Sequence, residues 1–342
     1  MKKKTVIIIS AAIFVTMALL AGTGAYIFFA PNTDCTQHTL IIPKNANFQQ
    51  VIDSLKKNNI IKNHNSFKLA ARIMKYEKQV KCGKYHLNEG ENNHKIIRRL
   101  RRGQHTPVKF TFNNIRTKEQ LAEKTDGIFF FESSDFYKLL NDSVFLSKYG
   151  FNSENCLTGF IPNTYEIFYD ITAEEFFEKM MNLYDGFWQG SRSQEAEKIG
   201  LTKIEVSILA SIVEEENHRN AEKAIIAGLY MNRLHKGMNL CADPTVKYAV
   251  GDFTLKRILN SHLEIDSPYN TYKYAGLPPG PIRIPEISTI DSVLHYSHHN
   301  YLYMCAKEDF SGYHNFAASA SQHAANAAKY HKALNRLQRS KK

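Results

Sequence analysis

The 342-residue sequence has few cysteines, and the five that it has are far apart in the chain. Cys35, Cys82, Cys156, Cys241 and Cys305 are odd in number and include no CxxC pair, the spacing that is typical of zinc and redox sites. Scattered free or buried thiols are the simpler interpretation, although an oxidising compartment would allow some of them to pair. The sequence predicts neither a metal site nor a cofactor.

Recognition motifs for nucleotides and nucleic acids are also absent. The chain contains no GxGxxG or P-loop sequence and no zinc-finger, RNA-recognition or basic-zipper pattern. Its formal net charge of +11 favours an anionic partner, such as phospholipid head groups, an acidic wall polymer or nucleic acid. Because the basic residues are spread through the chain, except at 98–102 and at the C-terminus, nucleic acid is the weakest of these options and is not predicted as a partner.

One long uncharged run lies near the start of the chain. Residues 5–30 follow three lysines and are long enough to cross a hydrocarbon core, which needs about 20 apolar residues. The lysines predict a cytoplasmic tail at 1–4 and a single transmembrane helix at 5–30, with the rest of the chain outside the cytoplasm. A cleaved signal peptide is the alternative, since small residues from Ala21 to Gly24 suit a cleavage region, but its apolar stretch is typically about 7 to 15 residues.

The pattern after residue 30 indicates an α+β fold. A polar linker at 31–38 precedes a small α+β unit at 39–108, and a larger α+β domain follows at 109–342 without internal repeats or the regular spacing of a doubly wound sheet. The expected strands are 39–42, 83–87 and 109–112, the expected helices include 93–100, 118–124, 173–188, a segment from near 202 and 220–237, and 159–165 is expected to be a loop.

Three consecutive glutamates end the helix-period segment 201–217. At about 100° per residue, Glu216 falls near the middle of the apolar arc, Glu215 at its edge and Glu214 on the opposite side. Partial burial of Glu216 beside like charges would raise its pKa and leave a proton available near neutral pH. The alternative is a solvated helix end, although negative charge at a helix C-terminus is unfavourable.

Two neighbouring segments carry further polar residues. Asn232 and Arg233 lie within the expected helix 220–237, where the plain interpretation is an exposed amide and an arginine paired with a carboxylate. Asp243 precedes Pro244 and has the form of a helix N-cap followed by proline at the first helical position. A structural role for Asp243 therefore stays open.

The segment 267–285 must be a stiff loop, because its five prolines restrict the backbone φ angles. Tyr269, Tyr272 and Tyr274 are carried on this loop. A stiff aromatic loop suits a carbohydrate groove, in which sugar faces stack on rings and hydroxyls accept or donate hydrogen bonds. The alternative is a structural turn whose tyrosines pack inward.

Several ordered motifs together carry a resemblance to a known family. They are ASIVEEE from Ala210, NRL at 232–234, GMNL from Gly237, DPTVKYAV from Asp243, SPYNTYKYAGLPPGPI from Ser267 and HNFAASASQH from His314. The chain resembles the YceG-like endolytic murein transglycosylases, and the resemblance spans the anchor, a LysM-like unit near 39–108 and a catalytic domain at 109–342.

The resemblance implies a lytic transglycosylase that cleaves the MurNAc–GlcNAc bond of peptidoglycan strands and leaves 1,6-anhydro ends. Glu216, the third acidic position of IVEEE, matches the family's catalytic glutamate. The implied groove residues are Asn232, Asp243, Tyr269, Asn270 and Thr271, and the aromatic loop adds Tyr272 to them. The implied chemistry needs neither a metal nor a cofactor.

Two positions depart from the family's pattern. The family's PDTY is Pro162-Asn163-Thr164-Tyr165 here, which removes a candidate second acid, and Cys241-Ala242 replaces the Gln-Thr or Gln-Ser that commonly precedes DPT. Two other functions stay open. One is a lysozyme-type hydrolase with Asp243 as its second carboxylate, and the other is a non-catalytic scaffold that binds the cell wall.

The expected location is the cytoplasmic membrane of a bacterium, crossed once, with the catalytic domain outside. The expected partners are peptidoglycan glycan strands and the membrane itself. The resemblance also implies association with wall-elongation proteins such as penicillin-binding proteins.

Overall fold

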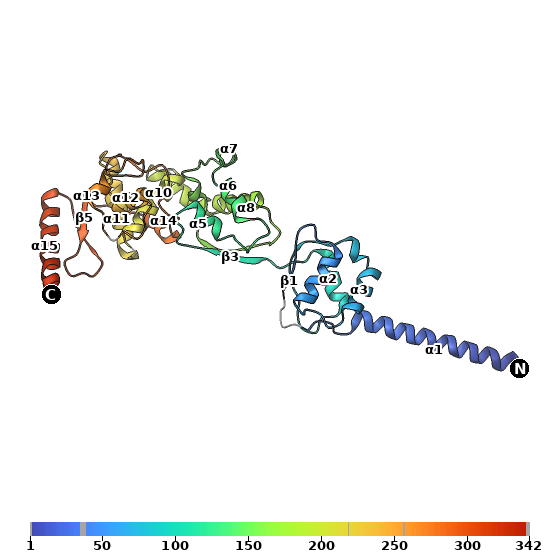
Figure 1. Ribbon diagram of the computed structural model, residues 1–342. Coiled ribbons are helices and arrows are strands. Elements are labelled where there is room, and N and C mark those ends of the chain that lie inside the picture. Colours follow the sequence, from blue (N-terminus) through green and yellow to red (C-terminus); the bar gives the residue numbers. More distant parts are fainter. Residues whose placement is uncertain (1, 35–38, 218, 256, 340–342) are drawn as a thin grey trace. The chain divides into compact units, whose positions relative to one another are not determined.

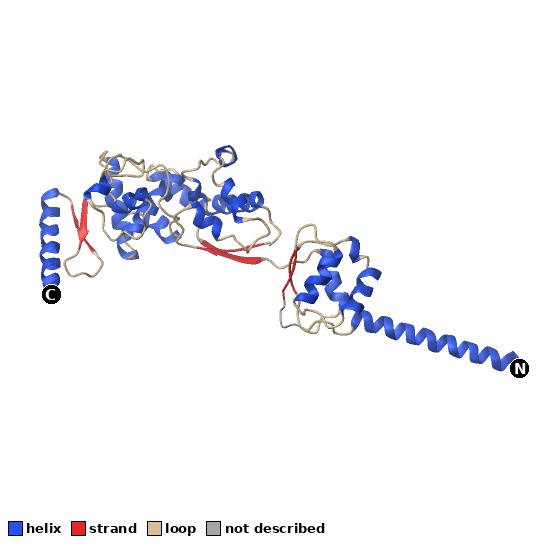
Figure 2. Cartoon of the chain, in the orientation of Figure 1, coloured by secondary structure: helices blue, strands red, loops and turns tan. Residues whose placement is uncertain are grey.

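The computed structural model describes residues 2–34, 39–217, 219–255 and 257–339, and it divides into two compact units (Figure 1). The small unit comprises Met1–Phe110, Gly127–Glu132 and Tyr165–Thr172, and the large unit comprises Thr111–Asp126, Ser133–Thr164 and Ala173–Lys342. Helices predominate and the strands form small two-stranded sheets (Figure 2), so the predicted α+β class is confirmed. The LysM-like character of the small unit stays a prediction.

The small unit packs helices against one antiparallel strand pair. Its elements are α1 (Lys2–Phe29), β1 (Thr39–Ile42), α2 (Phe48–Lys57), α3 (His64–Ile73), β2 (Gly83–His86) and α4 (Asn93–Arg102). β1 and β2 pair with Thr39 opposite His86, and every second residue of β1 is buried. The helices begin at asparagine caps and α4 ends at Gly103, whose φ of +68° is the left-handed conformation that glycine adopts at little cost.

Helix α1 is 28 residues long and points away from the rest of the small unit (Figure 1). Within the described part of the chain, Lys3–Phe29 is the one helix long and apolar enough to cross a membrane, with a mean hydropathy of 2.4 over its most apolar window. None of that window is buried in the protein. These properties fit the single membrane-spanning helix that the sequence predicts.

The first residues of the predicted polar linker contact the small unit. Asn32 and Thr33 are buried, and the backbone N–H of Asn32 donates to the carbonyl of Glu91 at 2.8 Å. The backbone N–H of Lys62 in turn donates to the Asn32 carbonyl at 2.8 Å. The side chains of Asn32 and Thr33 donate to the carbonyls of Asn63 at 3.0 Å and Asn88 at 2.8 Å, so these two polar residues satisfy buried backbone groups. Residues 35–38, the remainder of the predicted linker with Cys35, lie outside the described residues.

The large unit is mainly helical. Its elements are α5 (Lys118–Glu123), α6 (Ser133–Leu139), α7 (Ser143–Ser147), α8 (Ala173–Trp188), α9 (Ser191–Lys198), α10 (Lys203–Glu216), α11 (Asn220–His235), α12 (Asp243–Val250), α13 (Asn260–Leu263), α14 (Ile287–Leu294), β5 (Tyr303–Ala306), β6 (His314–Ala317) and α15 (Ala320–Arg339). β3 (Val108–Phe112) pairs with β4 (Asn163–Ile167), and the unit boundary falls within both strands. The predicted loop 159–165 therefore ends in a strand.

Helix α10 is the central element of the large unit. It begins at Thr202, whose side chain and that of Glu205 form a reciprocal capping box. α11 and α14 pack against it, and every residue from Val206 to Glu214 is buried. This part of the helix has no solvent face, so Glu214, which the periodicity places opposite the apolar arc, is buried as well.

Candidate active site

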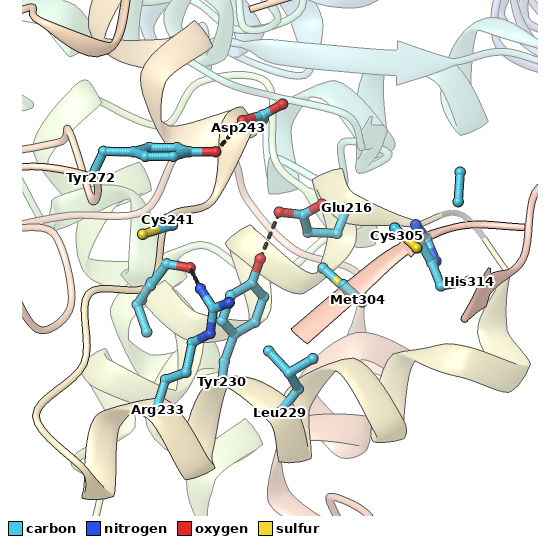
Figure 3. A pocket seen from close by; sticks show the side chains of 12 residues that line it. Glu216, Leu229, Tyr230, Arg233, Cys241, Asp243, Tyr272, Met304, Cys305 and His314 are labelled. Carbon is cyan, nitrogen blue, oxygen red and sulfur yellow. Dashed lines mark hydrogen bonds between the residues drawn. The ribbon is translucent and has the colours of Figure 1, made fainter. Parts of the chain in front are cut away.

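A cavity of about 210 Å³ opens where α10 ends, between α11, α12 and the β5–β6 hairpin (Figure 3). Six polar or ionisable side chains on its wall matter for chemistry: Glu216, Tyr230, Arg233, Asp243, Tyr272 and His314. Among the described residues, no group of three or more His, Cys, Asp or Glu side chains is arranged to hold a metal ion.

Glu216 is the last residue of α10 and lies half-buried in the cavity wall. The pKa of its carboxyl is raised to about 7, chiefly by burial, and the carboxylates of Asp243 and Glu215 act in the same direction. The Tyr230 hydroxyl donates to Glu216 Oε1 at 2.6 Å and acts to lower the pKa, as does the charge of Arg233. The balance leaves Glu216 partly protonated near neutral pH, which suits a group that must both donate and accept a proton.

Asp243 lies at the start of α12, on the other side of the Glu216 carboxyl from Tyr230 (Figure 3). The N-cap of this helix is Ala242 and no side chain caps it, so the N-cap role considered for Asp243 is not the one it has. Its carboxylate instead accepts a 2.6 Å hydrogen bond from the Tyr272 hydroxyl. Asp243 and Tyr272 therefore form a polar pair in the same cavity as Glu216.

The backbone before Asp243 is held in an uncommon conformation. Cys241 has a φ of +48°, in the left-handed region that residues with a side chain rarely adopt. Thr271 holds this segment, because its carbonyl accepts from the Cys241 N–H at 3.0 Å and its hydroxyl accepts from the Ala242 N–H at 3.0 Å. Strained positions of this kind cluster at functional sites, where surrounding contacts maintain them.

Arg233 also connects separate segments around the cavity. Its Nε donates to the Leu302 carbonyl at 2.7 Å, and its Nη1 donates to the carbonyls of Asn239 and Leu240. It therefore ties α11 to the approach of β5 and to the segment before α12. The plain interpretation paired Arg233 with a carboxylate. Within the described residues, the acceptors of its hydrogen bonds are backbone carbonyls instead.

The other two glutamates of the run have separate ion pairs. Glu214 is buried and accepts from the Thr289 hydroxyl and from Lys223 Nζ, the latter at 3.1 Å. Burial acts to raise the pKa of Glu214, but these two donors outweigh it and the pKa is lowered. Glu215 accepts from Arg116 at 2.8 Å and Arg283 at 2.9 Å. Of the three, Glu216 is the one that lines this cavity.

Asn270 and Thr271, two of the predicted groove residues, are wholly enclosed in the protein. The Asn270 amide donates to the carbonyls of Leu263 and Ile265, and its oxygen accepts from the Tyr272 backbone. Thr271 shares a hydrogen bond with the Thr245 hydroxyl in addition to its bonds to 241–242. Both side chains are used to fix the loop that carries Tyr272.

The remaining predicted groove residues lie away from the Glu216 cavity wall. The Asn232 amide donates to the carbonyls of His299 at 2.7 Å and Tyr301 at 3.0 Å. Tyr269 lies against Tyr248 in a different cavity, with ring centroids 4.8 Å apart and ring planes tilted by 44°. Asn163, which was not a predicted groove residue but a departure from the family's pattern, is exposed on β4, and its side-chain oxygen accepts from the Thr164 backbone N–H. The structure therefore brings together only Glu216, Asp243 and Tyr272 from the predicted set.

Sequence reasoning missed Tyr230 and the residues of the β5–β6 hairpin. Tyr230 is fully buried in the middle of the packing face of α11, and a buried tyrosine hydroxyl needs a partner, which is the signal that would have found it. Met304 and Cys305 of β5 and His314 of β6 enter the wall through a hairpin that the sequence pattern did not reveal. His314 begins the HNFAASASQH motif but had no role assigned to it.

A second cavity of about 200 Å³ adjoins the first. Both cavities are lined by Glu216 and Asp243, and the second continues along α12 past Pro244 and Lys247 to Arg257. The two carboxylates therefore stand where the cavities meet. Open space on both sides of an acid is what an extended polymer needs if it is to be cut internally.

Comparison with known proteins identifies the family. The sequence model of a protein family described as the YceG-like family matches residues 40–329. A Bacillus subtilis protein named endolytic murein transglycosylase is 31% identical over 287 residues, which cover 78% of this chain and 78% of that protein. A Streptococcus pneumoniae protein of the same name is 28% identical over 302 residues, 78% of this chain and 54% of that protein, so the chain spans about half the length of the streptococcal relative.

A solved structure agrees with the sequence relatives. The crystal structure of a yceG-like protein from Listeria monocytogenes matches with a TM-score of 0.56 and 26% identity, and the match covers 84% of this chain and 97% of that one. The family match extends over most of the chain and includes the whole cavity around Glu216. The chain therefore belongs to the YceG-like family.

Proposed function

We propose that the protein is a membrane-anchored lytic transglycosylase that cleaves the MurNAc–GlcNAc bond within peptidoglycan strands and leaves 1,6-anhydro-MurNAc ends. The curated relatives named endolytic murein transglycosylase support this function. The observation that carries it in this chain is Glu216, a half-buried carboxyl with a pKa near 7 at the junction of two open cavities.

One carboxyl group is sufficient for this reaction. Protonated Glu216 donates its proton to the glycosidic oxygen while the bond from MurNAc C1 to that oxygen breaks. The resulting carboxylate accepts the proton of the MurNAc C6 hydroxyl, whose oxygen bonds to C1 and closes the anhydro ring. Glu216 ends protonated, so no water is consumed, and a second carboxylate to activate water is unnecessary.

The residues around Glu216 divide into two roles. Asp243 and Tyr272 line the cavity and are proposed to contact the sugar next to the scissile bond. Asn232, Asn270 and Thr271 are proposed to position the cavity walls through their backbone contacts. Tyr269, in its separate cavity, is proposed to contact only sugars farther along the strand. The departures at Asn163 and at Cys241-Ala242 leave Glu216 and its tyrosine in place.

Identification of the new glycan ends tests the proposal. Purified peptidoglycan digested with the protein should yield fragments that end in 1,6-anhydro-MurNAc, recognised by mass spectrometry. Free reducing ends would instead support the lysozyme-type hydrolase with Asp243 as second carboxylate. Glycan binding without cleavage would support a wall-binding scaffold.

Replacement of Tyr230 by Phe should move the pH profile. The Tyr230 hydroxyl stabilises the charged form of Glu216, so its loss raises the pKa of the carboxyl above 7. The protonated form is then present at higher pH, and the alkaline limb of kcat/KM for production of anhydro ends should shift upward by about 1 pH unit. Tyr184→Phe, at a buried tyrosine of α8, is the matched control and should leave the limb unchanged. An unshifted limb in the Tyr230 variant would show that this hydroxyl does not tune the acid.

The orientation of the anchor is proposed from Lys2, Lys3 and Lys4, which precede the apolar stretch of α1. A reporter enzyme fused to the C-terminus should be active only when placed outside the cytoplasm, and the mature protein should keep its N-terminus. A protein shortened near residue 25 would identify the segment as a signal peptide. With the large unit outside, wall-elongation proteins such as penicillin-binding proteins are proposed partners, to be sought by co-purification.

A further inference from the structure

The positive charge of the protein is concentrated in the small unit. Residues 31–110 contain 16 Lys and Arg against 5 Asp and Glu, a net charge of +11 that equals the net charge of the entire chain. Residues 111–342 carry a net charge of −3. Solubility alone does not require the positive charge to be concentrated in one 80-residue segment. The concentration therefore indicates that this segment lies next to an anionic partner.

The small unit is attached to α1 without a flexible connection. Ile27 and Phe28 pack against its hydrophobic core, and the Asn93 amide at the start of α4 donates to the Ile27 carbonyl at 2.8 Å. Asn32 then ties the chain to the segments before α3 and α4. The end of α1 and the first turns of α3 and α4 therefore form one packed junction.

Helix length sets the depth of this junction in a membrane. At about 1.5 Å per residue, a hydrocarbon core of about 30 Å is crossed by about 20 residues from Thr5, so the helix reaches the outer head groups before residue 29. Tyr26 and Phe29, 65% and 61% exposed, stand where interfacial aromatic residues are expected. The Phe29 ring lies 5.7 Å from the ring of His94, the second residue of α4. The start of α4 is thus at the level of the head groups.

Exposed basic and apolar side chains lie on the two helices that contact α1. Leu69 and Ile73 lie one turn apart on α3, are 44% and 57% exposed, and therefore form an apolar pair on the helix surface. Lys95 and Arg98 are exposed on the first turns of α4. α3 and α4 pack against each other and both contact α1. We call these four residues the α3–α4 face.

We propose that the α3–α4 face lies on the outer surface of the membrane that α1 spans and binds anionic phospholipid head groups. Lys95 and Arg98 pair with lipid phosphates, and Leu69 and Ile73 enter the interface beside them. The proposal rests on the membrane span proposed for α1, which supplies the lipid surface at this level. An acidic wall polymer would satisfy the charge but gives no reason for exposed apolar residues next to the anchor.

Tryptophan fluorescence in the full-length protein tests this placement. Trp188 is the single native tryptophan and is fully buried in the large unit, so it gives a constant background. Leu69→Trp in vesicles that contain brominated phosphatidylglycerol should be strongly quenched. Ile41→Trp, an exposed position on β1 away from α1 (Figure 1), is the matched control and should be quenched little. Equal quenching at the two positions would overturn the proposal.

Charge removal tests the lipid preference. Each basic residue near an anionic surface favours binding by about fivefold, so Lys95→Gln with Arg98→Gln should lower the ratio of docked to undocked protein by about 25-fold. Lys44→Gln with Lys84→Gln removes the same charge beside and within the β1–β2 pair and should have little effect. Replacement of phosphatidylglycerol by phosphatidylcholine should reduce quenching of the tryptophan introduced by Leu69→Trp.

Flotation of the protein with vesicles separates failure of the anchor from failure of the face. Protein that floats but shows no dependence on anionic lipid would overturn the proposal and leave the anchor intact. Protein that does not float would overturn both. If the emission of the Leu69→Trp variant responds to soluble poly(glycerol phosphate) and not to phosphatidylglycerol, the face binds a wall polymer instead.

Discussion

Replacement of Glu216 by Gln should lower the rate at which anhydro ends form by about 10⁴-fold or more. General acid–base participation contributes about 10² to 10⁴ in rate, and the same carboxyl acts first as acid and then as base. Gln keeps the size and can accept the hydrogen bond of Tyr230, but it can neither donate the required proton nor accept one from the C6 hydroxyl. The measurement is the initial rate of anhydro-MurNAc production from purified strands.

Stability of the same variant separates loss of chemistry from loss of folding. The folded pKa of Glu216 is raised to about 7 from 4.5, so the folded protein binds this proton more tightly than the unfolded chain does. Proton binding by Glu216 therefore stabilises the folded protein at acid pH. As the pH rises through about 7, the free energy of unfolding falls by up to about 3 kcal/mol. Gln carries no such dependence, and Glu216→Gln should unfold at higher urea than the native protein above pH 8. An inactive variant that is also less stable there would point to a structural role.

Replacement of Glu214 by Ala should destabilise the large unit by about 3 to 5 kcal/mol. The change leaves Lys223, which is 3% exposed, as a buried charge without its carboxylate. An unpaired buried charge lowers the free energy of unfolding more than the removal of both charges does. Because the pKa of Glu214 is lowered, the stabilisation that it provides is present above the unfolded pKa and is lost as the pH falls through the folded value. Urea denaturation of the two proteins at pH 7 measures the difference.

A double replacement provides the control for Glu214. Glu214→Leu with Lys223→Met removes both charges and keeps the volume filled, so it should recover most of the stability lost by Glu214→Ala. Its cleavage rate should equal that of the native protein, since neither residue lines the Glu216 cavity. Inactivity of a stable double variant would place the pair in the chemistry and contradict the assignment of Glu216 as the single acid.

The parts of the fold that follow from local sequence were predicted well. Strand 39–42 and helix 173–188 coincide with β1 and α8, because alternation and helical periodicity are recorded in the residues themselves. The hairpin of β5 and β6 was missed, since its residues are all only partly buried apart from Ala317 and so give weak alternation. α10 shows the limit of periodicity, because a helix buried on every side gives no reliable face.

The sequence could predict which residue types of the site are chemically reactive, but not which side chains contact one another. Glu216 was selected by its position on the helix and by the motif, and its catalytic role stays a prediction that its burial and its raised pKa support. The polar motif residues Asn232, Asn270 and Thr271 could not be separated from Asp243 and Tyr272 by sequence, since the difference lies in what their side chains contact. Tyr230 reaches Glu216 through the packing of α11 on α10, a tertiary fact that spacing does not contain.

The most direct measurement is digestion of peptidoglycan in water enriched in heavy oxygen, with mass analysis of the new MurNAc ends. The native protein is predicted to give anhydro ends without heavy oxygen, because the C6 oxygen of the substrate closes the ring, and Glu216→Gln is predicted to give no new ends of either kind. New ends that carry heavy oxygen would mean that water is the nucleophile, and anhydro ends from Glu216→Gln at the native rate would mean that another group is the acid.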